Sequence, residues 1–277
     1  SRQGKHTKRG DKQHRYYCLR LNFNSNALDM IKIENISKSF GDNLVLDNIS
    51  ATFERGKTNL IIGQSGSGKT VLTKICIGLF EPDNGVVTFD NRQFSNAKEK
   101  SKIDIRKEMG VLFQGGALFD SMNVEQNVMF PLDMFTDLSY EEKLERVNFC
   151  LNRVNLKGIN NMMPSELSGG MMKRVAIARA ISNNPKYLFC DEPNSGLDPL
   201  TSELIDDLIS EITQEYNITT IINTHDINSV IKIGQTINFL YKGKLWWMGD
   251  NKSVINSDNE ELNNFLFSTE LTKRLKI

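Results

Sequence analysis

Cysteine is scarce in this sequence, and long apolar runs are missing. No pair of cysteines has the C-x-x-C spacing, so free, buried thiols in a reducing compartment are the favoured interpretation. No apolar run reaches the roughly 18 residues that a membrane span requires, and we therefore expect any membrane contact to pass through a partner. The four cysteines are Cys18, Cys76, Cys150 and Cys190.

The chain has no formal net charge, because 34 Lys and Arg residues balance 34 Asp and Glu residues. Overall charge therefore gives no indication of a nucleic-acid partner. The distribution is uneven, since residues 1–29 hold seven Lys and Arg residues but only Asp11 and Asp29 as acids. We interpret residues 1–29 as a basic, disordered or artificially added extension. A transit-like targeting segment is the alternative, although the stretch is poor in serine and shows no amphipathic face.

One stretch fits the phosphate-binding loop pattern G-x-x-x-x-G-K-[ST]. Its glycines allow main-chain N–H groups to approach a phosphate at the positive end of a helix dipole. Lys69 adds a mobile positive charge for the outer phosphates, and the Thr70 hydroxyl is placed to bind Mg²⁺. The flanks, a strand pattern before and a helix pattern after, favour this reading over a Gly/Ser-rich surface turn. The stretch consists of Gly63, Gln64, Ser65, Gly66, Ser67, Gly68, Lys69 and Thr70.

Strand and helix patterns alternate along the rest of the body. Strands are expected at 31–40, 44–53, 58–62, 86–89, 110–113, 187–190 and 219–223, with a terminal hairpin at 237–241 and 244–248. Helices are expected at 71–79, from about 124, at 139–154, 172–182, 201–216 and 260–275. The apolar side of the helix expected at 260–275 indicates that this helix either docks on a partner or covers the core of its own chain. This order predicts an α/β core with a helical insertion.

Acidic residues follow a continuous apolar run. The pattern at 187–190 is typical of a central parallel strand, which would deliver Asp191 and Glu192 to its carboxyl edge. Charges there are costly unless they meet a cation or a polarised water. Asp191 is suited to Mg²⁺, and Glu192 to orienting or deprotonating water. His225 ends the next buried strand pattern and could reach a γ-phosphate, although a lone histidine is usually structural.

Two weaker signals allow two interpretations each. Phe40 ends the first strand pattern, where it could stack on a base or pack in the core. Ser168, Gly169 and Gly170 precede a helix pattern, as in a phosphate-binding helix start or a plain helix-entry turn.

Taken together, these motifs resemble the ATP-binding subunit of an ABC transporter over about residues 31–250. Several separate motifs in the right order are far more specific than a single loop. Residues 63–70 match the Walker A loop, Gln114 the Q-loop, 167–171 the signature, 187–192 Walker B with its catalytic glutamate, 195–198 the D-loop, and His225 the switch histidine. Phe40 falls where the family places its adenine-stacking aromatic.

The resemblance implies an α/β P-loop NTPase fold of the ABC type, with an antiparallel β subdomain and an α-helical subdomain. It divides the chain into the extension at 1–29, an ATP-binding domain at 30–250 with a helical subdomain inserted at about 115–165, and a helical tail at 251–277.

The resemblance also implies ATP and Mg²⁺ as ligands. It assigns catalysis to Glu192, His225 and Gln114, and metal binding to Thr70, Gln114 and Asp191. ATP would be bound by Phe40, by residues 63–70, and by Ser168, Gly169 and Gly170 across a head-to-tail homodimer.

One departure from the family pattern is informative: the usual signature ends in Gln, where this chain has Met171. The sequence at 112–124, 127–128, 131–132 and 167–174, which includes Met171, resembles the Mla or Mce-associated branch. That branch moves phospholipids or other lipids between membranes. That branch implies an integral membrane permease, an Mce-type lipid-binding protein and a peripheral location on the cytoplasmic face of the inner membrane. The apolar loop after Gln114 would then receive a permease helix through Leu118, Phe119 and Met122.

Three other functions stay open. The nearest is a transporter subunit for another cargo, such as amino acids. A soluble ABC ATPase, for example one that serves iron-sulfur assembly, would fractionate without membranes. A translation or repair ABC protein would bind nucleic acid, but such proteins usually carry paired cassettes or long coiled coils, so we expect no nucleic-acid partner.

Overall fold

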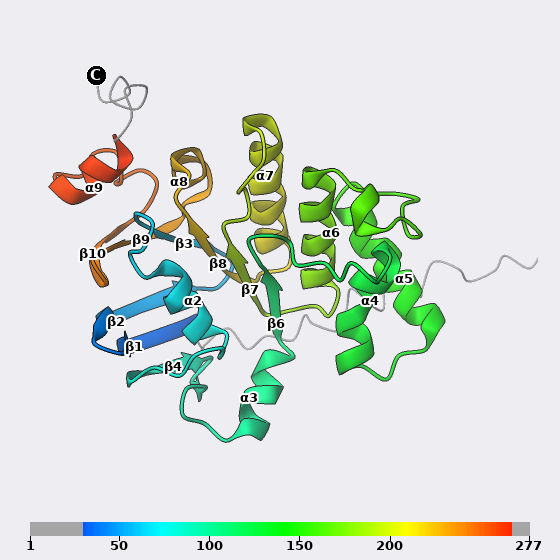
Figure 1. The fold of residues 1–277 in the computed structure, drawn as a ribbon, viewed down its shortest axis with the longest axis horizontal. Helices are drawn as coiled ribbons and strands as arrows, with labels where there is room; N and C mark the ends of the chain where they lie inside the picture. The colour runs from blue at the N-terminus through cyan, green and yellow to red at the C-terminus, as the bar shows by residue number, and fades with distance from the viewer. Residues whose placement is uncertain (1–29, 268–277) are drawn as a thin grey trace, which may run out of the picture.

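The computed structural model describes residues 30–267. The predicted extension at 1–29, with Cys18, and the end of the predicted tail helix lie outside the described residues. Two β-sheets form the centre of the described part, and helices surround them (Figure 1).

The smaller sheet is antiparallel and has the strand order β2-β1-β4-β5. The larger sheet has the order β10-β9-β3-β8-β7-β6; β9 to β6 run parallel, and β10 pairs antiparallel with β9. The strands are β1 (Met30–Phe40), β2 (Asn43–Glu54), β3 (Thr58–Ile62), β4 (Asn84–Phe89), β5 (Arg92–Gln93), β6 (Met109–Leu112), β7 (Tyr187–Asp191), β8 (Thr219–Thr224), β9 (Thr236–Tyr241) and β10 (Lys244–Gly249).

The helices lie along the larger sheet and at both ends of the molecule, with α7 and α8 over its middle (Figure 1). In Figure 1, α4, α5 and α6 lie at the end away from β1, β2 and β4. The helices are α2 (Lys69–Cys76), α3 (Glu99–Arg106), α4 (Val124–Phe135), α5 (Tyr140–Arg153), the 3₁₀ turn η1 (Pro164–Glu166), α6 (Gly169–Ile181), α7 (Pro199–Glu215), α8 (Ile227–Ile233) and α9 (Glu260–Leu266).

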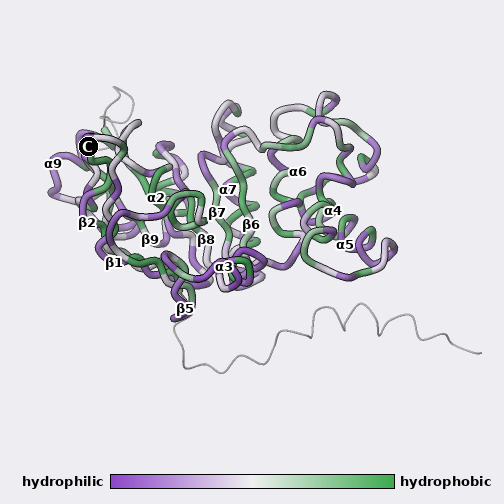
Figure 2. The backbone as a smooth tube through the Cα atoms, turned by 60° about the horizontal axis from the view of Figure 1, so that its bottom comes forward, coloured by the Kyte–Doolittle hydropathy of each residue, from purple (hydrophilic) through white to green (hydrophobic). Residues whose placement is uncertain are grey.

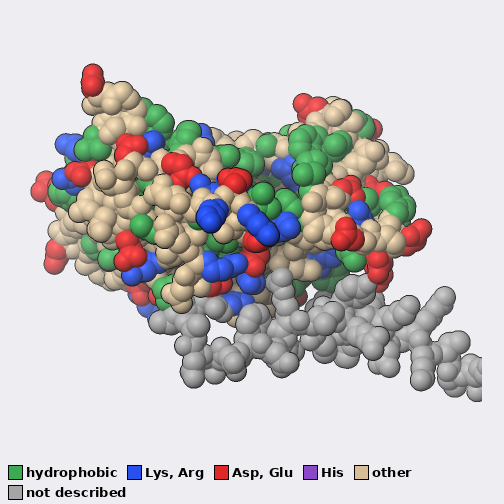
Figure 3. Space-filling model, turned by 90° about the horizontal axis from the view of Figure 1, so that it is seen from below, with side chains coloured by type: hydrophobic (Ala, Val, Ile, Leu, Met, Phe, Trp, Pro, Cys, Tyr) green, Lys and Arg blue, Asp and Glu red, His purple; other side chains and the backbone are tan. Residues whose placement is uncertain are grey.

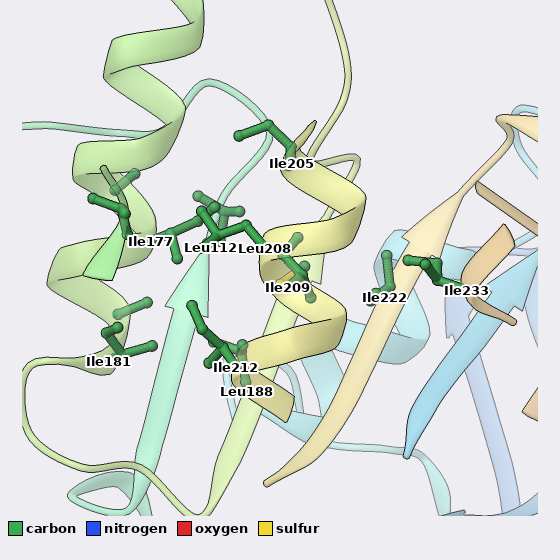
Figure 4. Close-up of a cluster of buried hydrophobic side chains, with 14 of the residues drawn as sticks. Leu112, Ile177, Ile181, Leu188, Ile205, Leu208, Ile209, Ile212, Ile222 and Ile233 are labelled. Carbon is green, nitrogen blue, oxygen red and sulfur yellow. The ribbon is translucent and has the colours of Figure 1, made fainter. Parts of the chain in front are cut away.

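The larger sheet separates two apolar cores, because successive side chains of a strand point to opposite faces. On β7, Leu188 belongs to one core and Phe189 to the other. The first core packs the sheet against α4, α5, α6, α7 and α8. Figure 4 shows side chains of α6 facing Leu112 and α7, with Leu188 beside Ile212 and Ile222 beside Ile233. The second core packs the opposite face against α2 and the antiparallel sheet. Figure 2 shows the resulting apolar segments running through the inner strands and helices.

Three cysteines of the described residues are free and buried, as the spacing predicted. Burial raises the pKa of Cys76 to about 12 and that of Cys150 to about 11. Burial also raises the pKa of Cys190. These thiols stay protonated and pack as small apolar side chains.

The predicted α/β class is confirmed, and most elements lie within one or two residues of the predicted ranges. A capping box lies at the start of α5, where Ser139 accepts from the N–H of Glu142 and the Glu142 side chain accepts from the N–H of Ser139. Three predicted helix starts are wrong. Helix α2 begins at Lys69, α6 at Gly169 and α7 at Pro199, because their first turns hold glycine, proline and polar residues that carry no apolar period.

The C-terminal helix covers the core of its own chain. Helix α9 buries Leu262, Phe265 and Leu266, and the rings of Phe265 and Phe239 lie 5.5 Å apart. Trp246 Nε1 donates to Glu261 at 2.9 Å. Among the helices at 30–267, none has the length and hydropathy needed to cross a bilayer.

Acidic and basic side chains are interspersed on the face seen in Figure 3. On α3, for example, Lys102 pairs with Glu81 and Arg106 with Glu99. The Arg106–Glu99 pair is at the surface, where such pairs add little to stability, whereas Lys102 is buried and reaches Glu81 from inside.

Candidate functional site

The phosphate-binding loop connects β3 to α2 and has room only for glycine at two positions. The main chain of Gly68 has a φ of 104°, and a Cβ there would meet Leu46 Cδ2 at 2.5 Å. A Cβ on Gly63, where φ is 151°, would meet Leu240 O at 2.3 Å. The backbone can therefore turn tightly and direct N–H groups toward an anion at the start of α2.

Lys69 lies inside the loop and is 7% exposed. Its Nζ donates to Gly63 O at 2.8 Å and to Gln64 O at 3.1 Å. Burial lowers the pKa of Lys69, while Glu192 and Asp191 act in the opposite direction. Neutral carbonyls are weak partners for a buried ammonium, so the side chain is available to a phosphate.

Another polar group of the loop, the Ser67 hydroxyl, has no hydrogen-bond partner among residues 30–267. Ser67 Oγ is buried. An unpaired buried hydroxyl is costly, and a phosphate oxygen in the loop would satisfy it.

Asp191 ends β7 beside the start of α2. Its Oδ1 lies 3.5 Å from Thr70 Oγ1 and accepts from Asn223 Nδ2 at 3.0 Å. Thr73 Oγ1 donates to Asn223 Oδ1 at 2.9 Å, which fixes the amide. A hydroxyl and a carboxylate that face each other provide the oxygen ligands that Mg²⁺ prefers. These residues therefore fit the metal that the sequence predicted.

Glu192 lies next to His225, and His225 Nδ1 is 2.8 Å from Glu192 Oε2. The Glu192 side chain is 14% exposed, whereas that of His225 is 65% exposed. Glu192 has a φ of 49°, in the left-handed region that non-glycine residues rarely adopt. Its N–H donates to Asn223 O at 3.0 Å, which helps to hold this strained conformation. The carboxylate is thus directed to the edge of the sheet instead of its interior.

The main-chain oxygen of Gln114 links the segment after β6 to helix α6 and to the D-loop after β7. This oxygen accepts from Ser195 Oγ at 3.3 Å and from Lys173 Nζ. Lys173 Nζ also lies 3.5 Å from Glu192 O. Lys173 is 5% exposed, and burial lowers its pKa, while Cys190, Asp191 and Glu192 act in the opposite direction.

Sequence reasoning missed Lys173, Asn223 and Thr73. A polar residue inside the apolar strand pattern at 219–223 was the available signal for Asn223. Lys173 gives no such signal, because its partners lie far away in the sequence.

Replacing Lys173 by methionine should lower ATP turnover by about tenfold while the protein stays folded. Methionine keeps most of the length of the side chain but removes the cation that holds the carbonyls of Gln114 and Glu192, and small displacements of reacting groups are costly. Steady-state ATPase rates and the melting temperature would measure both effects. Lys143→Met is the matched control, since Lys143 on α5 pairs with Asp133 at 2.8 Å, away from this site. Equal rates in the two variants would contradict the role of Lys173.

The signature residues lie at the start of α6, apart from the phosphate-binding loop. Ser168 caps the helix, since its Oγ accepts from the N–H of Met171 at 3.2 Å. A Cβ on Gly170 would meet Thr201 Cγ2 at 2.8 Å, so a larger residue there would displace the Thr201 side chain. These residues line a hollow of about 380 Å³ together with Gly196 to Asp198 of the D-loop and part of α7. Residues 63–70, all of which are described, do not line it.

Phe40 stands at the end of β1 and is 44% exposed. Its ring meets that of Phe80 edge-on, with centroids 5.3 Å apart, and Lys38 Nζ lies 5.6 Å from its centre. Phe40 is therefore not a core aromatic, and its predicted stacking on adenine stays a prediction.

One copy of the chain thus brings together five of the predicted residues: Lys69, Thr70, Asp191, Glu192 and His225. It does not bring the signature residues to them. The arrangement can hold a phosphate chain with a hard cation and place a carboxylate beside it, but the three signature residues Ser168, Gly169 and Gly170 line a separate hollow.

Comparison with known proteins extends this description. The family model described as "ABC transporter" matches residues 46–195. The intermembrane phospholipid transport system ATP-binding protein MlaF of Escherichia coli K12 is 36% identical over 234 residues, which cover 84% of each chain. The probable ribonucleotide transport ATP-binding protein mkl of Mycobacterium tuberculosis H37Rv is 35% identical over 236 residues. These cover 85% of this chain but 66% of the mycobacterial protein, so this chain spans just under two thirds of that relative.

A solved structure also resembles the fold. It is the dimeric, post-hydrolysis state of the ATP-binding cassette MJ0796 bound to ADP and Pi, with a TM-score of 0.74 and 32% identity. The match covers 80% of this chain and 99% of the cassette.

Proposed function

Because this chain belongs to the ABC transporter family of ATPases, we propose that it binds and hydrolyses ATP to drive the transport of phospholipids or other lipids through a membrane permease. The observation that carries the lipid assignment is the 36% identity to the phospholipid-transport protein MlaF over 84% of both chains. Met171, in the signature position where the family usually has Gln, agrees with this branch.

In the proposed reaction, the loop at 63–70 binds the phosphates, with Lys69 and the free Ser67 hydroxyl as side-chain donors. Thr70 and Asp191, with Gln114, would hold Mg²⁺, which when bound neutralises charge on the phosphates. Glu192 orients and polarises the attacking water, and His225, which contacts Glu192, holds the γ-phosphate. Phe40 stacks on the adenine from its exposed side.

We propose that two copies complete the site in a head-to-tail dimer. In one copy the signature residues and the D-loop line a hollow of their own, without the phosphate-binding loop. Ser168, Gly169 and Gly170 would then offer the start of α6 to the nucleotide held by the other copy. The dimeric state of the similar MJ0796 cassette supports this arrangement. Binding would close the dimer and hydrolysis would open it, as a population shift driven by nucleotide contacts.

The permease would contact the loop after Gln114. Phe119 is 39% exposed there and packs on Phe130 at 4.8 Å, while Leu118 and Met122 are partly buried. An exposed aromatic on a rigid helical support is suited to receive an apolar helix. We place the chain on the cytoplasmic face of the inner membrane, with an Mce-type lipid-binding protein in the same complex.

Replacing Phe119 by alanine should weaken association with the permease at least tenfold and leave the ATPase rate of the isolated chain within about twofold, because the ring is an interface anchor. Co-purification from membranes measures the first effect and a phosphate-release assay the second. Tyr140→Ala, at another exposed aromatic (56% exposed), is the control. Unchanged co-purification of the Phe119 variant would remove this loop from the interface.

Affinity purification of the full chain from native membranes, followed by lipid and protein analysis, tests the function itself. We expect phospholipid, a permease and an Mce-type protein to be enriched with the chain. The name of the mycobacterial relative makes ribonucleotides the second candidate cargo. Recovery of the chain with a permease but stimulation of its ATPase by ribonucleotides and not by lipid would favour that cargo. Recovery only in the membrane-free fraction would contradict both.

A further inference from the structure

A buried carboxylate on α7 takes no part in the proposed site. Asp206 is 2% exposed. Its Oδ1 accepts from Asn194 Nδ2 at 2.8 Å, and its Oδ2 accepts from Ser229 Oγ at 2.7 Å. Asn194 Nδ2 also donates to Ser229 Oγ at 3.0 Å. These three side chains close a buried triangle of hydrogen bonds, which we call the Asp206 triangle.

The Asp206 triangle joins the two connections that carry the proposed catalytic residues. Asn194 follows Glu192 by two positions, on the connection that leaves β7. Ser229 follows His225 by four positions, on α8 after β8. Through Asp206, both connections are attached to helix α7. Beyond them, His225 Nδ1 lies 2.8 Å from Glu192 Oε2.

Packing does not account for Asp206. Figure 4 shows the neighbouring inward residues of α7, namely Ile205, Leu208 and Ile209, in contact with the apolar core, so an apolar residue would continue that surface. Burial raises the pKa of Asp206, and the hydrogen bonds from Ser229 and Asn194 oppose this.

Two other features raise the free-energy cost of burying the Asp206 triangle. The nearby charges are Asp226, which adds to the rise in the pKa of Asp206, and Lys232, which opposes it. Asn194 Oδ1 is also buried without a hydrogen-bond partner. Buried polar groups at this cost specify one arrangement of the segments that they join.

We propose that Asp206 is a positioning residue for ATP hydrolysis. By holding Asn194 and Ser229 it fixes Glu192 and His225 relative to each other and to the γ-phosphate. The inference rests on the roles proposed above for Glu192 and His225. No residue of the phosphate-binding loop takes part in the three hydrogen bonds of the Asp206 triangle. Loss of the triangle should therefore affect turnover and not nucleotide affinity.

The test compares two substitutions at Asp206 in the full chain. Asp206→Ala should lower kcat for ATP by about tenfold or more, because small misplacements of reacting groups are costly, with the dissociation constant for Mg-ATP unchanged. Asp206→Asn should keep most of the activity, since its amide can accept from Ser229 and donate to the free Asn194 Oδ1 after that amide turns over. Asparagine fills the same space as aspartate, so rescue by the amide shows that the negative charge is not required. A lower kcat at an unchanged dissociation constant in Asp206→Ala is the result that a merely space-filling role does not predict.

Thr213→Val is the matched control on the same helix. Thr213 Oγ1 is buried, donates to Ile209 O at 2.7 Å and lies 2.6 Å from Thr220 Oγ1. Both Asp206→Ala and Thr213→Val leave buried groups unpaired and lower the melting temperature, but only the first should lower kcat. Ser229→Ala removes one hydroxyl of the Asp206 triangle and serves where Asp206→Ala does not fold.

Four results have distinct meanings. Equal kcat in the Asp206 or Ser229 variant and in Thr213→Val overturns the inference, as does a loss of affinity that matches the loss of kcat. If Glu192→Gln, assayed beside them, loses turnover while the Asp206 and Ser229 variants do not, the proposed function stands and only this inference fails. If Glu192→Gln keeps turnover, the proposed catalytic roles fail first.

Discussion

Glu192→Gln should bind Mg-ATP with the affinity of the unmodified chain and lose at least about 100-fold in turnover. Glutamine has the shape of glutamate but neither orients water through a charge nor accepts its proton, and such groups contribute roughly 100- to 10,000-fold. The carboxylate lies at the carboxyl edge of β7, 2.8 Å from His225, so the substitution changes its chemistry and leaves its position.

A trapped dimer is the second expected property of Glu192→Gln. If hydrolysis opens the closed dimer, a variant that binds but does not hydrolyse ATP accumulates in the closed form. Size-exclusion chromatography with and without Mg-ATP measures this, and Glu203→Gln, at an exposed position paired with Lys232 at 3.0 Å, is the control. Turnover within about threefold of the unmodified chain would remove Glu192 from its proposed role.

Lys69→Ala should affect nucleotide binding, the step before hydrolysis, and weaken Mg-ATP binding by about 10- to 100-fold. The estimate follows from the roughly 1.5–3 kcal/mol of a hydrogen bond to a charged group. Lys69 is buried among main-chain carbonyls, so its replacement removes the one side-chain cation of the loop. Isothermal titration or fluorescent-nucleotide binding measures the loss.

Lys74→Ala, on the same helix, is the control for Lys69→Ala. The Lys74 ammonium lies 5.6 Å from the centre of the Phe80 ring, outside residues 63–70. Unchanged affinity in Lys69→Ala would contradict the assignment of residues 63–70. Together with Glu192→Gln, the pair separates binding from chemistry in one chain.

Short contiguous motifs account for what the sequence predicts well. The loop at 63–70 and the acidic pair after 187–190 are local patterns, since a glycine-rich turn and an apolar strand reveal themselves within a few residues. The capping box at Ser139 and Glu142 is equally local. The core strands were predicted for the same reason.

Elements without a strong period were not predicted. Helix α3 has only Lys102 and Ile105 buried, so its sequence shows no apolar stripe. Helix α8 has seven residues, too few for a period to stand out. The two residues of β5 give no strand pattern either.

Contacts between distant segments were the other gap in the site. Lys173 meets Gln114, 59 positions away, and Asp206 meets Ser229, 23 positions away. Both side chains are charged residues on helices, where a solvent-exposed position is the usual expectation. Only the folded chain shows that they are buried and paired.

The two apolar cores on opposite faces of the larger sheet have a mechanical consequence. Helix α2, which carries Lys69 and Thr70, packs in one core, whereas α4 and α5, which precede the signature, pack in the other. A tilt of α4 and α5 during a transport cycle would therefore disrupt side-chain packing on one face alone. A force applied to α4 and α5 would leave the contacts to the triphosphate in place. The larger sheet would then separate a moving part of the chain from a fixed one.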